Sequence, residues 1–216
     1  MLSEKEYYEV LCQRHTAVIQ EKFRRARVAI AGLGGLGSNV AISLARAGVG
    51  QLHLIDFDRV DVSNIHRQQY RIKDIGRWKT EALSEILSEI NPFIQLKAEK
   101  VYVDERNMPD LFQEDDVVCE AFDKATEKAK LVNGIFEHYT KQILVSASGM
   151  AGLGSPNEIV SKKLNKRFYL SGDGTNGIED GLALFAPHVA VCANHQANMI
   201  LRIIAGYEED SNERCI

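Results

Sequence analysis

The spacing of apolar and polar residues predicts alternating strands and helices in the first part of the chain. The short apolar run Arg27–Ala31 is typical of a strand buried on both faces of a sheet, and "QLHLIDFD" (51–58) predicts the next strand. The segment between them, "SNVAISLARAGVG" (38–50), predicts a helix that is closed by Gly48 and Gly50. This order predicts a strand–helix–strand unit, which begins a parallel sheet with a right-handed crossover.

The middle of the chain continues the same alternation. In "KTEALSEILSEINP" (79–92), apolar residues recur at positions 83, 86, 87 and 90, which predicts an amphipathic helix that ends at Asn91-Pro92. The pattern predicts further strands over 94–103, 115–122 and 142–149, and a helix over about 125–139. Repeated alternation of strands and helices predicts a single doubly wound α/β domain with a mostly parallel, Rossmann-like sheet.

The two ends of the chain do not continue the alternation of strands and helices that is predicted for its centre. Ser3 and Glu6 match a capping box, which predicts an N-terminal helix running on into "RHTAVIQEKF". We expect segment 152–186 to be mostly irregular because it is rich in glycine. "HVAVCANHQANMILRIIAG" (188–206) predicts an apolar closing helix. The predicted organisation is an N-terminal helical segment (1–26), the α/β domain (27–206) and an acidic tail (207–216).

Composition narrows the class of protein. A chain of 216 residues, 45% hydrophobic and 26% charged, is typical of one globular domain. A net charge of −4 with no long basic run argues against nucleic-acid binding. No apolar stretch approaches the ~20 residues that cross a membrane, and the polar N-terminus does not resemble a signal peptide. We therefore expect a cytoplasmic protein.

The cysteines do not form a metal-binding pattern. They lie at positions 12, 119, 192 and 215, and no CxxC pair is present, so we expect no structural zinc. Cys119 and Cys192 lie in apolar segments and are interpreted as small core residues. Cys215 lies in the polar tail, where we expect it to be accessible rather than catalytic.

A glycine fingerprint follows the first predicted strand. Gly32, Gly34 and Gly37 form G-x-G-x-x-G between a strand and a helix, a context in which backbone N–H groups bind phosphate. Asp56 follows Gly37 by 19 residues and ends the second strand, where a carboxylate can bind ribose hydroxyls. No GK[ST] follows the glycines, so the loop is not an ATP-binding P-loop. To this point a nicotinamide dinucleotide explains the pattern as well as ATP does.

The residues after the second strand favour a triphosphate. Asn64, Arg67 and Gln68 lie just beyond it, and Lys79 opens the next helix. Two cations can offset the charge of a triphosphate, whereas hydride transfer has little use for them. Asp123 ends a later strand at the same edge of the sheet, where its carboxylate could hold Mg²⁺.

Each of these residues also has an ordinary structural interpretation. Arg67, Lys79 or Asn64, taken singly, could be a solvated surface residue, and Asp123 could be the N-cap of the following helix. Their joint placement at strand ends along one edge favours the functional interpretation.

The run "GLGGLGSNVAISLARAGVGQLHLIDFDRVDVSNIHRQ", with a lysine twelve residues after Arg67, resembles the ThiF/MoeB/HesA superfamily. The resemblance extends from Arg27 to about Gly206. It implies a doubly wound, usually homodimeric domain that adenylates the C-terminal glycine of a small ubiquitin-like sulfur carrier with Mg²⁺ and ATP. Segment 27–206 is then an ATP-binding adenylyltransferase domain.

The resemblance also implies roles for individual residues. Arg67, Lys79 and Asp123 would be catalytic, with Asp123 also the Mg²⁺ ligand, and Arg14 would cross to the partner's site. Residues that would bind the nucleotide are Gly32, Gly34, Gly35, Gly37, Asp56, Asp58, Asn64 and Gln68.

The chain departs from many family members in two ways. It lacks the two zinc-binding CxxC pairs, and the segment from Val145 to Val191 contains no cysteine that could link covalently to a carrier. This short, zinc-free form resembles a ThiF-like subgroup, which points to a ThiS-like carrier and thiamine biosynthesis. Two other functions stay open: an NAD(P)-dependent oxidoreductase, and a nucleotide-binding partner module without catalysis.

Overall fold

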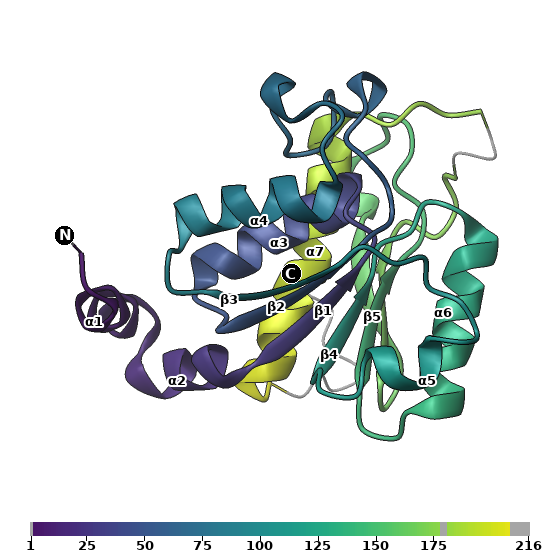
Figure 1. Cartoon of the computed structure of the whole chain (residues 1–216). Helices are drawn as coiled ribbons and strands as arrows, with labels where there is room; N and C mark the ends of the chain where they lie inside the picture. The colour runs from purple at the N-terminus through teal and green to yellow at the C-terminus, as the bar shows by residue number, and fades with distance from the viewer. Residues whose placement is uncertain (1, 178–180, 208–216) are drawn as a thin grey trace.

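The strands form one mixed sheet. The computed structural model describes residues 2–177 and 181–207. Within them, seven strands pair in the order β3-β2-β1-β4-β5-β7-β6, all neighbours being parallel except the antiparallel pair of β6 and β7 (Figure 1). The strands are β1 (Arg27–Ala31), β2 (Gln51–Ile55), β3 (Gln95–Glu99), β4 (Val117–Glu120), β5 (Ile143–Ala147), β6 (Val160–Asn165) and β7 (Phe168–Gly172). This arrangement confirms the predicted doubly wound α/β fold.

Helices cover both faces of the sheet (Figure 1). One apolar core lies beneath α3, α4 and α7, and a second lies beneath α5 and α6. The helices are α1 (Glu4–His15), α2 (Ala17–Arg25), α3 (Gly35–Ala47), α4 (Lys79–Ile90), α5 (Met108–Leu111), α6 (Ala125–His138) and α7 (Ala186–Ala205). Strands β2 and β3 lie on one side of β1 in the sheet, and β4 and β5, which come later in the chain, lie on its other side. A crevice is therefore expected where the loops after β1 and β4 diverge.

Segment 152–186, predicted to be mostly irregular, contains two strands that the sequence pattern did not predict. Residues Val160–Asn165 and Phe168–Gly172 form a hairpin, and β7 adds to the sheet beside β5. Tyr169 and Ser171 on β7 are buried, but β6 is an edge strand with mostly exposed or half-exposed residues. Neither face of β6 is buried, so its sequence carries little apolar alternation.

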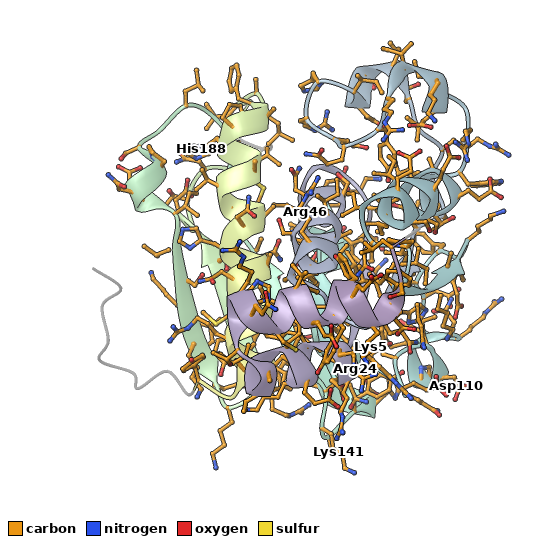
Figure 2. All side chains as sticks on the ribbon, turned by 90° about the vertical axis from the view of Figure 1, so that its left-hand side faces the viewer. Lys5, Arg24, Arg46, Asp110, Lys141 and His188 are labelled. Carbon is orange, nitrogen blue, oxygen red and sulfur yellow. The ribbon has the colours of Figure 1, made fainter. Side chains whose placement is uncertain are left out.

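The N-terminal segment is two helices rather than one. Thr16 separates α1 from α2 with a φ of 75°, and its side-chain oxygen accepts a hydrogen bond from the N–H of Ile19. Figure 2 shows both helices toward the end of the molecule that carries Lys141, away from His188 near the start of α7. The capping box at Ser3 is present as predicted.

Other predicted boundaries shift by a few residues. The strands predicted over 51–58, 94–103 and 115–122 end earlier, at positions 55, 99 and 120, and the short helix α5 was not predicted. Positions 208–216, including Cys215, lie outside the described residues. None of the helices in the described part of the chain is long and apolar enough to cross a membrane.

Candidate nucleotide-binding site

The turn from β1 into α3 can be built only with glycine at two positions. Gly32 has a φ of 92°, and a Cβ there would lie 2.8 Å from the carbonyl oxygen of Ala121. A Cβ on Gly37 would lie 1.8 Å from the carbonyl oxygen of Gly32. Both contacts are with backbone atoms, which a rotamer change cannot relieve. The glycines thus bring the start of α3 close to β1 and β4.

The N-terminus of α3 is open toward a cavity. Gly34 is the N-cap and supplies no side-chain hydrogen bond, so the first N–H groups of the helix are available to a ligand. A Cβ on Gly34 would meet only the Gln68 Nε2 atom, at 3.7 Å. Free N–H groups together with the helix dipole favour an anion at this point.

This cavity has a volume of about 520 Å³, within the range of small-molecule sites. It brings together ten of the predicted site residues: Gly32, Gly34, Gly35, Asp56, Asp58, Asn64, Arg67, Gln68, Lys79 and Asp123. Gly37 does not line it but lies beneath the turn, and Arg14 does not line it either.

Asp56 is fixed at the end of β2 by backbone donors. Its carboxylate accepts hydrogen bonds from the N–H groups of Leu33 and Asp58, both at 2.7 Å, and the residue is 7% exposed. Burial raises the pKa of Asp56, and the positive charge of Lys79 opposes that rise. The carboxylate is therefore held in one orientation beside the glycine loop.

Lys79 is buried among carboxylates. It is the first residue of α4, and its Nζ lies 2.8 Å from Asp58 Oδ2 and 3.9 Å from Asp56 Oδ2. The backbone N–H of Lys79 also donates to the Asp58 carbonyl at 3.0 Å, which fixes the start of the helix against the end of β2. Asp58, predicted to bind the nucleotide, is thus also the closest ion-pair partner of Lys79.

Arg67 and Gln68 retain unused hydrogen-bonding capacity. Arg67 donates to the carbonyl of Ser63 at 3.2 Å and forms no ion pair within the part of the chain that the structure describes. Gln68 is 8% exposed, and its Oε1 has no hydrogen-bond partner among the described residues. A buried acceptor without a donor is costly, so a ligand hydroxyl beside the loop would satisfy it.

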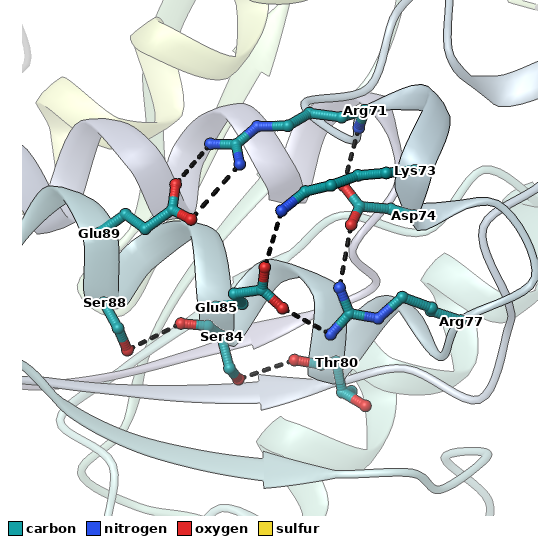
Figure 3. Close-up of polar contacts among 9 residues, drawn as sticks. All are labelled: Arg71, Lys73, Asp74, Arg77, Thr80, Ser84, Glu85, Ser88 and Glu89. Carbon is teal, nitrogen blue, oxygen red and sulfur yellow. Dashed lines mark hydrogen bonds and ion pairs between the residues drawn. The ribbon is translucent and has the colours of Figure 1, made fainter.

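The segment that follows these residues is tied to α4 by ion pairs (Figure 3). Arg71 pairs with Glu89 at 2.7 Å, and Lys73 and Arg77 pair with Glu85 at 2.9 and 2.8 Å. Buried Asp74 accepts from Arg77 at 3.0 Å. These contacts fix the connection between Arg67 and Lys79.

Asp123 is exposed at the cavity and is not the N-cap of α6. Lys124 is the N-cap, without a side-chain hydrogen bond, so the structural interpretation of Asp123 as a cap is wrong. Its carboxylate makes no hydrogen bond or ion pair to other described residues. The described residues contain no cluster of three or more potential ligands from His, Cys, Asp and Glu. Because Mg²⁺ is often held by one carboxylate, water and substrate phosphates, this donor set fits the ion.

Sequence reasoning missed a buried network beneath the cavity. Glu120 is fully buried, and its carboxylate accepts from Lys128 Nζ at 3.0 and 3.1 Å, Ser146 Oγ at 2.5 Å and the Phe122 N–H at 2.7 Å. An acidic residue in the otherwise apolar strand "VVCE" was the available signal. The network connects β4, β5 and α6 just before Asp123.

The buried cysteines are core residues, as predicted. Cys119 and Cys192 are fully buried, and burial raises the pKa of both thiols, that of Cys192 to about 12. A thiol with so high a pKa is not a reactive nucleophile. Cys12, on α1, is half-buried.

Known proteins resemble the chain across most of its length. The ThiF family profile matches residues 9–215. The molybdopterin-synthase adenylyltransferase of Escherichia coli is 31% identical over 208 residues, which cover 91% of this chain and 80% of that protein. An adenylyltransferase and sulfurtransferase uba4 of Aspergillus terreus is 44% identical over 105 residues, or 48% of this chain. That match spans about a fifth (22%) of the uba4 protein.

Solved structures share the fold at lower identity. The E. coli tRNA N6-threonylcarbamoyladenosine dehydratase TcdA, in complex with AMP, superposes with a TM-score of 0.82 at 21% identity, covering 94% of this chain and 96% of that chain. E. coli MccB with ATP has a TM-score of 0.68 at 22% identity, covering 94% and 63% of the two chains. The glycine turn, the cavity and the extent of the family match lead to one conclusion: the chain belongs to the ThiF family.

Proposed function

We propose that the protein uses ATP to adenylate the C-terminal glycine of a ubiquitin-like sulfur carrier. The observation that carries this proposal is the convergence of a glycine turn, the oriented carboxylate of Asp56 and the cations Arg67 and Lys79 on one cavity. Membership in the ThiF family and the similarity to an adenylyltransferase over most of both chains support the same activity.

The chemistry requires charge compensation rather than a general base. A terminal carboxylate is ionised at pH 7, and one of its oxygens attacks the α-phosphorus. The bond from the α-phosphorus to the oxygen that bridges it to the β-phosphorus breaks, and pyrophosphate leaves with the electron pair. Arg67 and Lys79 reduce the repulsion between the two anions and stabilise the leaving group. Mg²⁺, held by Asp123 and the phosphates, would supply further positive charge.

The carrier is proposed to be ThiS-like, with a C-terminal Gly-Gly, and the pathway to be thiamine biosynthesis. The absence of CxxC pairs and of a cysteine between Val145 and Val191 supports a short, zinc-free form of the family. The active unit is proposed to be a homodimer in which Arg14 of each protomer reaches the partner's site.

The carrier is proposed to dock on segment 152–186. Leu153, Leu182 and Phe185 expose 73%, 37% and 39% of their surface there, and Leu184 lines the cavity. Exposed apolar side chains near a cavity are typical of an interaction surface. Hydrogen exchange in this segment should slow when the carrier is added, and unchanged exchange at saturating carrier would place docking elsewhere.

Carrier-dependent ATP–pyrophosphate exchange tests the activity. The assay uses a ThiS-like protein that ends in Gly-Gly, with Mg²⁺ and no added zinc. Exchange that disappears when the terminal glycine is removed supports the proposal. ATP binding without exchange for any carrier would favour a partner module without catalysis, and tight NADH binding in place of ATP would favour an oxidoreductase.

A further inference from the structure

A buried carboxylate lies beneath the loop that carries Asp123. Glu120 ends β4 and is fully buried. Its Oε1 accepts from the N–H of Phe122 at 2.7 Å and from Lys128 Nζ at 3.1 Å, and its Oε2 accepts from Lys128 Nζ at 3.0 Å and from Ser146 Oγ at 2.5 Å. A buried ion pair can often be replaced by apolar residues without loss of stability, so stability alone does not account for this one.

Asp123 lies between two residues that bind this same carboxylate. Phe122 precedes it, and Lys128 follows it on α6. Asp123 itself is exposed, and its carboxylate makes no hydrogen bond or ion pair within the parts of the chain that the structure describes. Because no side-chain contact there holds Asp123, its position depends on the backbone that Glu120 holds on both sides.

The same loop packs tightly against the glycine turn. Ala121, Phe122 and Asp123 line the cavity together with Gly32. A Cβ on Gly32 would lie 2.8 Å from the carbonyl oxygen of Ala121 and 2.9 Å from Phe122 Cδ1. The backbone between Glu120 and Asp123 therefore has a fixed place beside the turn that is proposed to bind phosphate.

We propose that Glu120 and Lys128 are positioning residues that set the place of Asp123 relative to the glycine turn, so that one Mg²⁺ can bind Asp123 and the ATP phosphates together. This inference rests on the proposed use of ATP with Mg²⁺. Mg²⁺ requires near-ideal octahedral geometry, so a site with one protein carboxylate depends on where that carboxylate lies. The Glu120–Lys128 pair is neutral as a whole, so it supplies orientation to the site rather than net charge.

The role is tested by measuring ATP binding with and without the metal. Calorimetric titration gives the Kd of ATP in the presence of Mg²⁺ and in the presence of EDTA for wild type, Glu120→Gln, Lys128→Met and Asp123→Asn. In all three variants we expect ATP binding with Mg²⁺ to weaken about tenfold and ATP binding in EDTA to change less than about twofold. Equal weakening in both conditions, or unchanged binding with Mg²⁺, in Glu120→Gln or Lys128→Met would overturn the positioning role.

A double variant tests whether Lys128 acts through Glu120. If it does, Glu120→Gln/Lys128→Met should weaken ATP binding with Mg²⁺ no more than the stronger single variant does, because both changes disrupt one network. Additive losses would show that Lys128 acts on the ligand directly, and would overturn its role through Glu120.

Asp115→Asn is the matched control for a general loss of stability. Asp115 is 5% exposed, precedes β4 at its opposite end, and has its Oδ2 2.9 Å from Nδ1 of buried His53, away from the cavity. The variant should lower the free energy of unfolding and leave both ATP Kd values unchanged. Loss of the Mg²⁺ effect in this control as well would show that destabilisation alone produces it, and would overturn the positioning role.

Ser146→Ala keeps the proposal testable if Lys128→Met does not fold. It removes one donor to Glu120 and leaves the ion pair in place. We expect ATP binding with Mg²⁺ to weaken about threefold, with binding in EDTA unchanged. Binding with Mg²⁺ equal to that of wild type would overturn the role of the network.

The positioning role and the proposed function fail in different ways. If wild type does not bind ATP, both fail. If wild type supports carrier-dependent exchange and Asp123→Asn shows the loss specific to Mg²⁺, while the Glu120 and Lys128 variants bind ATP as wild type does, only the positioning role is wrong.

Discussion

Lys79 Nζ and Asp56 Oδ2 lie 3.9 Å apart, although one residue begins α4 and the other follows β2. Both residues are almost fully buried, at 6% and 7% exposure. The two charges compensate each other in an environment where either alone would be costly. The cation proposed to act on ATP therefore also stabilises the carboxylate proposed to bind ribose.

Replacing Lys79 by Met should destabilise the fold in a pH-dependent way. Burial raises the pKa of Asp56 and Lys79 lowers it, so the pKa should rise further in the variant. A carboxyl group whose pKa is higher in the folded state than in the unfolded state destabilises the folded protein as pH rises. The destabilisation begins near the pKa of the unfolded state and is complete above the pKa of the folded state. We expect a loss of about 3 kcal/mol in the free energy of unfolding at pH 7 and a smaller loss at pH 4, measured by urea denaturation.

The double variant Lys79→Met/Asp56→Asn provides the control. It lacks the Asp56 carboxyl group, so its stability difference from Asp56→Asn should vary less between pH 4 and pH 7 than the difference between Lys79→Met and wild type, and any variation that is left comes from Asp58, the other carboxylate beside Lys79. A loss for Lys79→Met that is the same at both pH values would show that Asp56 does not depend on Lys79.

Arg67→Ala should remove catalysis and leave the fold intact. The side chain lines the cavity and forms no ion pair within residues 2–177 and 181–207, so its removal leaves no described carboxylate unpaired. We expect carrier-dependent pyrophosphate exchange to fall by at least about 100-fold, with an unchanged circular dichroism spectrum. Arg106→Ala, at an exposed position away from the cavity, is the control. Near wild-type exchange in a folded Arg67→Ala protein would remove Arg67 from the mechanism.

Replacing the two glycines Gly34 and Gly37 should affect different properties: stability for Gly37 and ATP binding for Gly34. A Cβ at Gly37 would collide with the Gly32 carbonyl oxygen at 1.8 Å, so Gly37→Ala should cost about 3 kcal/mol or more in the free energy of unfolding. A Cβ at Gly34 meets only Gln68 at 3.7 Å, so Gly34→Ala should change stability by less than about 1 kcal/mol but weaken ATP binding. Thermal unfolding and ATP titration of both variants measure the two effects, and the reverse ranking of stability would contradict the geometry.

The parts of the site that depend on local chain geometry could be predicted from the sequence. Gly32 and Gly37 are required by the turn itself, and Asp56 follows a strand whose apolar run is evident. Parallel strands place their carboxyl ends at one edge, so the convergence of Arg67 and Lys79 followed from topology.

Contacts between distant segments could not be predicted in the same way. The pairing of Tyr102 with Glu127 depends on where the connection after β3 meets α6, which no local pattern encodes. The hairpin containing β6 was missed because an edge strand with exposed residues lacks the burial that produces an apolar period. The break at Thr16 depends on a positive φ that threonine rarely adopts.

Arg14 should act in the partner's site if the protein is a homodimer. Arg14 is exposed on α1 and does not line the cavity of its own chain. We expect Arg14→Ala to lower pyrophosphate exchange by at least about tenfold while leaving ATP binding largely intact. In a dimer of one Arg14→Ala and one Arg67→Ala subunit, the first keeps Arg67 and receives Arg14 from the second, so one complete site forms. Subunit exchange between the two inactive variants should therefore restore about a quarter of wild-type activity, and no recovery despite confirmed exchange would show that Arg14 does not act across the dimer.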